Sequence, residues 1–180
     1  MLNSSVIERY AVEKITSDDF RRTFRNHPGG VAVITADAGE GPVGLTATSV
    51  SSVHADPPTL VFSASQMSSS TPVLLRAETV VVHLLSAGQV DIARLCATSG
   101  IDRFADSSIW SRLPSGEPYF PSAQNWLRCR VIERVPVSGS TLVVAEAVEA
   151  SPERATDDDD SRALVYHNRT WHALGDASRF

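Results

Sequence analysis

Stretches of β-branched and apolar residues recur along this chain, separated by clusters of turn-forming residues. Each stretch has the length and composition of a β-strand, and the Gly, Pro, Asn and Asp between them are typical of turns. The predicted strands are 31–36, 43–53, 59–65, 80–85, 126–137, 141–150, 163–167 and 170–174. The last two are expected to form a hairpin.

Short helices are predicted at three places between the strands. The first begins at residue 16 or 17, where a hydroxyl side chain can cap it, and it carries Phe20 and Phe24 on one face. The second, over 71–76, is expected to have Thr71 as its N-cap and a proline at its first helical position, where proline is favoured. The third, over 86–97, opens with the serine and glutamine spacing of a capping box.

The order of these elements predicts the fold class. Strands and long helices do not alternate regularly, which argues against a doubly wound parallel sheet, and residues 98–122 are irregular. A mainly β, antiparallel barrel with a few short appended helices fits better. We expect a single domain over 16–176, preceded by an arm over 1–15, and a solvated loop at the acidic run 157–160.

Composition narrows the classes of function. Hydrophobic residues make up 42% of the chain and charged residues 21%, with a mean hydropathy of −0.07, as in water-soluble proteins. The formal net charge of −5 argues against a nucleic-acid partner, which needs a clustered basic face. Cys96 and Cys129 lie far apart, and no apolar run has the length of a membrane span or the features of a signal peptide. A cytoplasmic protein without a membrane partner is therefore predicted.

One motif is misleading. Gly39–Gly44 matches G-x-G-x-x-G after a strand, but the dinucleotide-binding motif needs a helix to start at its third glycine. Residues 45–50 are β-prone instead, so a hairpin turn is predicted. The histidines lack metal-ligand spacing and no G-x-S-x-G occurs, so we assign no metal site and no catalytic side chain.

Hydroxyl groups are concentrated in two segments. Residues 44–52 carry five hydroxyl side chains on a predicted strand, which suits a surface for a planar heterocycle. Residues 68–72 carry four more at a predicted helix start, where free N–H groups and hydroxyls suit a phosphate. A polar edge strand followed by an ordinary serine-rich loop explains the same residues without any ligand.

The order of these segments resembles the short-chain flavin reductase family, which has the FMN-binding split-barrel fold and supplies the reductase component of two-component flavin monooxygenases. The resemblance extends from about Phe20 to Leu174. Its motifs lie at 24–35, 44–53, 56–58, 69–71, 81–85, 102–104, 127–129 and 164–167, with Trp171 following. The resemblance implies an antiparallel split β-barrel with short appended helices.

The resemblance also implies where cofactors bind. The flavin ring is expected against 46–49, with Ser63 and Ala64 in the same pocket, and the phosphate at 69–71. Arg103 and His167 are candidates for contacts to the pyridine nucleotide, although a surface arginine and an ordinary hairpin histidine explain them equally simply. The implied cofactor-binding residues are Gly30, Thr46, Ala47, Thr48, Ser49, Ser63, Ala64, Ser69, Ser70, Thr71, Arg103 and His167.

Three positions depart from the family pattern. Many members have Gly-Asp-His between the two long strands, where this chain has Gly139-Ser140-Thr141, which bears on the site of the hydride donor. Thr48 and His83 stand where asparagines are usual, and His83 is interpreted as a strand or interface histidine.

The predicted activity is that of an NAD(P)H:flavin oxidoreductase. Hydride passes from nicotinamide C4 to the N5 atom of FMN or FAD, with NADH or NADPH as co-substrate, and the reduced flavin diffuses to a partner monooxygenase. A homodimer is implied. Two alternatives stay open: a flavin-binding carrier or regulatory protein without reductase turnover, and a split-barrel flavoenzyme that retains its flavin.

Overall fold

The structure, a computed structural model, describes residues 14–152 and 161–179. Its helical segments are α2 (Ser17–Arg25), α3 (Thr71–Leu74), η2 (Ala87–Gln89), α4 (Val90–Ala97) and η4 (Asp176–Ser178). Its strands are β1 (Gly29–Gly30), β2 (Ala32–Asp37), β3 (Pro42–Ala47), β4 (Ser51–Ala55), β5 (Pro58–Ser65), β6 (Thr79–Leu84), β7 (Ser111–Arg112), β8 (Pro118–Tyr119), β9 (Asn125–Val137), β10 (Ser140–Ala150), β11 (Leu164–His167) and β12 (Thr170–Ala173). The predicted mainly β, antiparallel class with short helices is confirmed.

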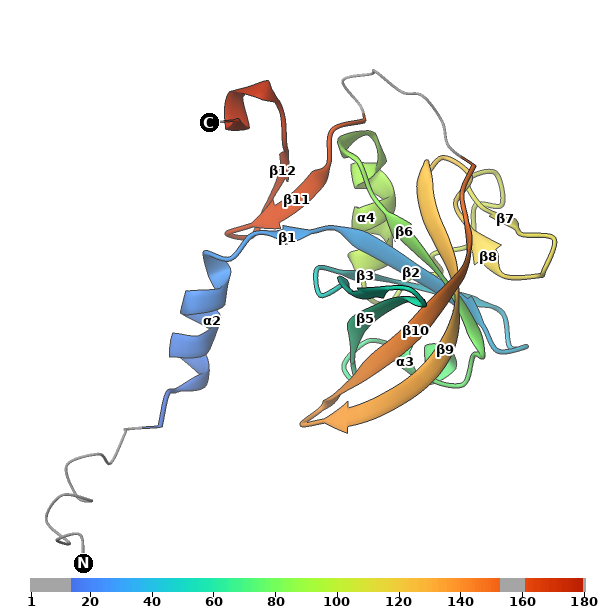
Figure 1. Cartoon of the computed structure of the whole chain (residues 1–180), viewed down its shortest axis with the longest axis horizontal. Helices are drawn as coiled ribbons and strands as arrows, with labels where there is room; N and C mark the ends of the chain where they lie inside the picture. Colours follow the sequence, from blue (N-terminus) through green and yellow to red (C-terminus); the bar gives the residue numbers. More distant parts are fainter. Residues whose placement is uncertain (1–13, 153–160, 180) are drawn as a thin grey trace, which may run out of the picture.

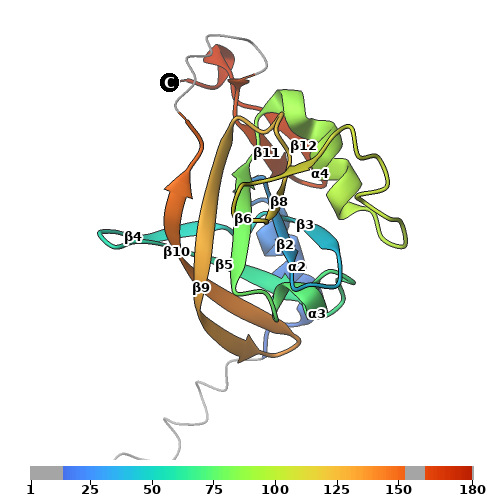
Figure 2. The same cartoon turned by 90° about the vertical axis from the view of Figure 1, so that its right-hand side faces the viewer.

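A seven-stranded antiparallel sheet in the order β3-β2-β6-β9-β10-β5-β4 forms the body of the molecule (Figure 1). Strands β3 and β4 stand at opposite ends of this order, and no ladder joins them within the described residues. A smaller sheet, β1-β11-β12, continues from the start of β2. In both views α4 lies near one end of the main sheet and α3 near the other (Figure 2).

Both faces of β2 are buried, which explains its nearly continuous apolar sequence. Ile34 and Ala36 pack with Phe62 and Val143 inside the curved main sheet, and Leu74 of α3 joins this core. Val33 faces the opposite way, into a second core beneath α4 and the segment 98–123. The sheet and α4 therefore stand in a fixed relation, and the site described below lies where they meet.

Helix α2 projects from the body (Figure 1), and none of its residues is buried. Thr16 caps it by accepting a hydrogen bond from the Asp19 N–H, as expected. The rings of Phe20 and Phe24 pack at a tilt with their centroids 4.5 Å apart, yet the two side chains are 53% and 56% exposed. No described helix is long and apolar enough to span a membrane.

The structure corrects three details of the predicted elements. Residues 43–53 are not one strand: β3 ends at Ala47 and β4 begins at Ser51, because these two strands lie at opposite ends of the main sheet and 48–50 connect them. Ser70, not Thr71, is the N-cap of α3, which ends two residues earlier than expected. The segment 98–122 contains the short β7–β8 hairpin.

Two further predictions concern residues that the structure largely leaves undescribed. Of the predicted N-terminal arm, residues 1–13 lie outside the described residues. The predicted solvated loop at 157–160 also lies outside them.

Candidate functional site

A cavity of about 410 Å³, here called the ring cavity, opens between β3, β5 and the C-terminal end of α4. It is lined by Leu45, Thr46, Ala47, Ser49, Ser63, Ser65, Ser68, Cys96, Ala97, Ser99 and Arg103. The structure thus brings the predicted ring-binding residues Thr46, Ala47, Ser49 and Ser63 around one hollow. Ala64 does not line this hollow, because its side chain is fully buried in the core.

The hydroxyl groups beside the ring cavity hold its two sides together. Thr46 Oγ1 donates to the Ala93 carbonyl of α4 at 2.6 Å. Ser49 Oγ accepts a hydrogen bond of 3.0 Å from the Ser63 N–H of β5. Because these hydroxyls are already paired, the cavity offers a ligand mainly small side chains and backbone polar groups, which suits a flat heterocycle.

The thiol of Cys96 in this cavity is expected to be unreactive as a nucleophile. Burial raises the pKa of Cys96 to about 12, against a smaller opposing effect of the Arg103 charge. The thiol is therefore protonated at neutral pH, and thiols react as nucleophiles in the thiolate form. Cys96 is a neutral part of the cavity lining.

Arg103 lies at the edge of the ring cavity beside two serines, a group here called the anion site. Its Nη1 lies 3.0 Å from Ser70 Oγ and 3.4 Å from Ser69 Oγ, and its Nη2 donates to the Thr98 carbonyl at 2.7 Å. Its Nε is buried with no hydrogen-bond partner within the described residues. An unpaired guanidinium N–H beside serine hydroxyls fits an anionic group, which would satisfy it.

The rest of the predicted phosphate segment has a structural role. The Ser70 hydroxyl donates to the Gly44 carbonyl at 2.7 Å, and the buried Thr71 hydroxyl donates to the Ser65 carbonyl at 2.7 Å. Helix α3 has only four residues. Its macrodipole is therefore small, so an anion at this place would interact with Arg103 more than with the helix.

A larger groove of about 780 Å³, here called the α2 groove, runs between helix α2 and the body. Phe20 and Phe24 line one side of it, and Gly29-Gly30 and Tyr166 line the other. Its charged and hydroxyl side chains are Arg21, Arg25, Arg169, Thr48, Ser49 and Ser51. Ser49 lines both this groove and the ring cavity, so the two hollows meet there.

The two histidines considered in the sequence are placed differently. His167 does not line the α2 groove, and its ring faces that of His172 at 5.8 Å between centroids. His83 is fully buried in β6. Its Nδ1 lies 3.0 Å from the Val33 carbonyl, and its Nε2 accepts from the Phe120 N–H at 3.1 Å. The interpretation of His83 as a strand histidine is confirmed.

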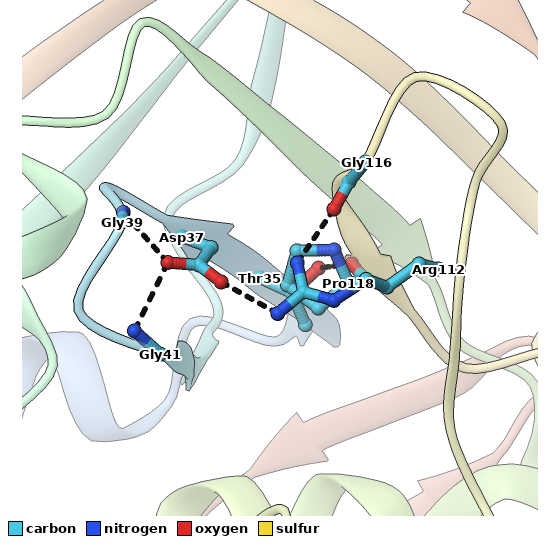
Figure 3. Close-up of polar contacts among 7 residues, drawn as sticks. All are labelled: Thr35, Asp37, Gly39, Gly41, Arg112, Gly116 and Pro118. Carbon is cyan, nitrogen blue, oxygen red and sulfur yellow. Dashed lines mark hydrogen bonds and ion pairs between the residues drawn. The ribbon is translucent and has the colours of Figure 1, made fainter.

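The Gly39–Gly44 motif forms the β2–β3 hairpin turn, as predicted (Figure 3). Asp37 Oδ1 accepts from the Gly39 and Gly41 N–H groups at 2.8 and 3.1 Å, and its Oδ2 pairs with Arg112 at 2.6 Å. Burial tends to raise the pKa of Asp37, but these hydrogen bonds outweigh it and hold the pKa below its usual value. No group of three or more potential metal ligands gathers within residues 14–152 and 161–179.

Comparison with known proteins identifies the family. The model of the flavin reductase like domain matches residues 24–175. This chain belongs to the flavin reductase family. An NADH:FMN oxidoreductase from Rhodococcus qingshengii is 41% identical over 160 residues, covering 88% of this chain and 82% of the relative.

Solved flavin reductases have the same architecture. A flavin reductase domain protein from Arthrobacter sp. FB24 superposes with a TM-score of 0.81 at 29% identity, covering 89% of this chain and 96% of that one. The Streptomyces globisporus C-1027 NADH:FAD oxidoreductase SgcE6, in complex with NAD and FAD fragments, has a TM-score of 0.77 at 25% identity. The match covers 93% of this chain and 99% of the SgcE6 chain.

Within this flavin reductase, the departure at Gly139-Ser140-Thr141 lies near the ring cavity. Ser140 pairs with Ser65, which lines the cavity, and the Gly139 carbonyl accepts from the Gln66 N–H at 3.1 Å. The turn is thus next to the site, and it carries no histidine.

Sequence reasoning missed several lining residues of this flavin reductase. Arg25, Tyr166 and Arg169 meet in the α2 groove although about 140 positions separate the first from the other two. The Asn168-Arg169 turn was recognisable, but nothing local indicated what its arginine faces. Ser65 and Ser68 were visible only as part of a serine-rich segment.

Proposed function

We propose that this chain is an NAD(P)H-dependent flavin reductase that reduces FMN or FAD and supplies the reduced flavin to a partner monooxygenase. The observation that carries the proposal is the meeting of three features. A cavity walled by small residues has an anion site with an unpaired guanidinium N–H at one edge, and the α2 groove opens onto it at Ser49. The names of the relatives support the same chemistry.

The flavin is proposed to lie in the ring cavity with its phosphate at the anion site. Thr46, Ala47, Ser49 and Ser63 line the space for the ring. Arg103 and the Ser69 hydroxyl are proposed as donors for the phosphate, and Ser70 is proposed to hold Arg103 in place by accepting from its Nη1. This assigns Arg103 to the flavin phosphate, whereas the sequence made it a candidate for the pyridine nucleotide.

The hydride donor is proposed to lie in the α2 groove. The side chains of Arg25 and Arg169 line it, and the structure gives neither of them a hydrogen-bond or ion-pair partner among the described residues, so both are free to pair with nucleotide phosphates. Phe24 and Tyr166 offer aromatic faces for a purine. Because Ser49 borders both hollows, a nicotinamide in the groove is near a ring in the cavity.

The proposed reaction is NAD(P)H + H⁺ + flavin → NAD(P)⁺ + reduced flavin, with hydride passing from nicotinamide C4 to flavin N5. The two substrates supply the redox chemistry. The protein's contribution is to hold the rings in contact and to neutralise their phosphates, and we assign no side-chain acid or base. The high pKa of Cys96 agrees with this, since its thiol stays protonated.

We also propose the finer fold and assembly that the family resemblance implies. The main sheet would be a split barrel, forming one domain over 16–176. Two copies would form a homodimer, which the exposed Phe20 and Phe24 and the exposed apolar side chains of β9 and β10 support. Two buried, free cysteines support a reducing location, the cytoplasm.

A second candidate is a flavin-binding carrier without reductase turnover. The absence of a histidine from the turn around Gly139 favours it, because that turn lies beside the ring cavity. Both candidates predict flavin binding, and only the reductase predicts catalytic oxidation of the nicotinamide.

The test is to mix the purified protein with each pairing of NADH or NADPH with FMN or FAD and to follow absorbance at 340 nm. The reductase predicts a multi-turnover decrease with at least one pairing. Tight flavin binding with no decrease above the protein-free rate would establish the carrier instead. Dialysis before the assay shows whether the flavin is exchanged or retained.

A further inference from the structure

Arg103 stands in the middle of a tight turn that is held by side-chain hydrogen bonds. Asp102 Oδ1 accepts from the Phe104 N–H at 2.9 Å, which closes the turn across Arg103. The Phe104 carbonyl accepts from the indole Nε1 of Trp110 at 2.9 Å. The two chain neighbours of Arg103 therefore make the bonds that fix its backbone.

The segment from Phe104 to Trp110 forms a closed loop with bonds of its own. Asp106 Oδ1 accepts from the Ser108 N–H at 2.9 Å and from the Ser108 hydroxyl at 2.6 Å. The rings of Phe104 and Trp110 meet edge to face, with their centroids 5.2 Å apart. Trp110 thus joins the far end of the loop to the residue that follows Arg103.

The backbone and the guanidinium of Arg103 are both placed relative to Gly44 of β3. The Phe104 ring lies beside this glycine, since a Cβ atom added to Gly44 would lie 3.5 Å from two of the ring atoms. The Gly44 carbonyl accepts from Ser70 Oγ, and that oxygen lies 3.0 Å from Arg103 Nη1. A movement of Phe104 away from Gly44 would therefore carry the backbone of Arg103 away from the serine that its guanidinium meets.

We propose that Trp110 is a positioning residue for Arg103, acting through its bond to the Phe104 carbonyl. This inference rests on the proposed function, because it takes Arg103 as the group that meets the flavin phosphate. Ser70 and Thr98 hold the far end of the arginine side chain, and Trp110 holds the near end. An arginine loses rotamer freedom when it binds a ligand, and a side chain ordered beforehand loses less. Trp110 lines neither the ring cavity nor the α2 groove, so its effect on the flavin passes through Arg103.

Trp110 is itself connected to the main sheet through Arg112. The guanidinium carbon of Arg112 lies 5.7 Å from the centre of the Trp110 ring. Arg112 also pairs with Asp37 at the end of β2 and donates to the Gly116 carbonyl at 2.6 Å (Figure 3). The loop that holds Arg103 is therefore supported from the sheet and not only by its own bonds.

The test measures dissociation constants for FMN and riboflavin by calorimetry in Trp110→Phe, with Trp126→Phe as the matched control. Phenylalanine keeps an aromatic ring beside Phe104 and removes the N–H donor. Trp126 packs edge to face with Tyr119 and lines neither the ring cavity nor the α2 groove. We expect Trp110→Phe to weaken FMN binding about 2- to 10-fold, the effect of one neutral hydrogen bond, and to leave riboflavin binding nearly unchanged. Trp126→Phe should change neither.

A positioning role also predicts that the effect of Trp110 needs Arg103. Trp110→Phe should therefore add little to the loss of FMN affinity in Arg103→Met. Arg112→Met, at a partly exposed position, is the second variant in case Trp110→Phe does not fold, and it should weaken FMN binding more than riboflavin binding.

Two results would overturn the positioning role of Trp110. One is an equal loss of FMN and riboflavin binding in the folded variants, and the other is a full additional loss of FMN binding on the Arg103→Met background. The oxidation of NADH by the wild-type protein with FMN tests the proposed function separately, because the binding measurements do not depend on turnover.

Discussion

At the scale of single residues, Arg103 is the side chain that we propose to hold the flavin phosphate. Its guanidinium reaches both Ser69 and Ser70, and its Nε has no partner within the described residues. A charge-assisted hydrogen bond contributes about 1.5–3 kcal/mol, and each 1.4 kcal/mol is a factor of ten in affinity. We therefore expect Arg103→Met to raise the KM for FMN roughly 10- to 100-fold.

Riboflavin is the control for this prediction, because it has the same ring and no phosphate. Its KM should change little in Arg103→Met, and Arg103→Lys should restore part of the FMN affinity. Steady-state kinetics with both flavins measures the effect. An equal loss for FMN and riboflavin would mean that Arg103 supports the cavity and not the phosphate.

His83 makes the folded state sensitive to acid. Burial lowers its pKa to about 4, against a smaller opposing effect of the hydrogen bond to the Val33 carbonyl. The unfolded chain, with a histidine pKa near 6.5, binds more protons between pH 6.5 and 4. The contribution of His83 to the free energy of unfolding therefore has its full value above pH 6.5. It decreases by on the order of 3 kcal/mol as the pH falls toward 4.

Urea unfolding at pH values from 7.5 to 4 measures this dependence. His83→Asn should lower stability at pH 7.5, because the new side chain reproduces the buried hydrogen bonds poorly, and should flatten the fall between pH 6.5 and 4. If folded His83→Asn loses stability between pH 6.5 and 4 as steeply as the wild type, groups other than His83 cause the pH dependence.

At the scale of elements, the close contact between β1 and the segment after β3 shapes the entrance between the α2 groove and the ring cavity. A Cβ atom added to Gly29 would lie 2.8 Å from Thr48 Cβ and 3.0 Å from its carbonyl oxygen, whereas one added to Gly30 meets nothing within 4 Å. Overpacking of this kind costs about 1–3 kcal/mol. Gly29→Ala should therefore lower the thermal unfolding temperature by several degrees, and Gly30→Ala, its matched control, should leave it nearly unchanged.

Calorimetry of the two alanine variants measures the difference in stability. Thr48 must shift when Gly29 becomes alanine, and the neighbouring Ser49 lines both hollows. The KM for NADH should therefore rise in Gly29→Ala. Identical unfolding temperatures for the two variants would contradict the contact.

At the scale of the whole molecule, helix α2 is exposed, because the rest of the described chain buries none of its residues. Phe20 and Phe24 are 53% and 56% exposed on a helix with no buried residue, and such apolar surfaces usually mark an interface. In the proposed homodimer they contact the second copy. Sedimentation should show a dimer for the wild type and a lighter species for the double variant Phe20→Ser, Phe24→Ser.

A control for this change is Val148→Ser with Val137→Ser, which removes two other exposed apolar side chains from β9 and β10. Comparing the sedimentation of the two double variants shows which apolar surface forms the dimer interface. A wild-type protein that sediments as a monomer at micromolar concentration would reject the homodimer.

Local patterns along the chain determined much of this protein in advance. Runs of β-branched and apolar residues predicted most strands, capping residues predicted the starts of α2 and η2, and the β-prone residues after Gly39–Gly44 predicted a turn there. These features depend on neighbours within a few positions, so they can be recognised from sequence. The order of the motifs was enough to indicate the family, which the comparisons confirm.

Only the tertiary structure decided which side chains meet. Nothing near Arg103 in the sequence indicates that it reaches Ser69 and Ser70, more than 30 positions earlier, or that Ala64 faces the core. The break at 48–50 reflects the places of β3 and β4 at opposite ends of the sheet, and it brings Thr48 against Gly29, a neighbour in space but not along the chain. Contacts of this kind arise when distant segments pack together, so the positions of the ring cavity, the anion site and the α2 groove follow from the folded arrangement alone.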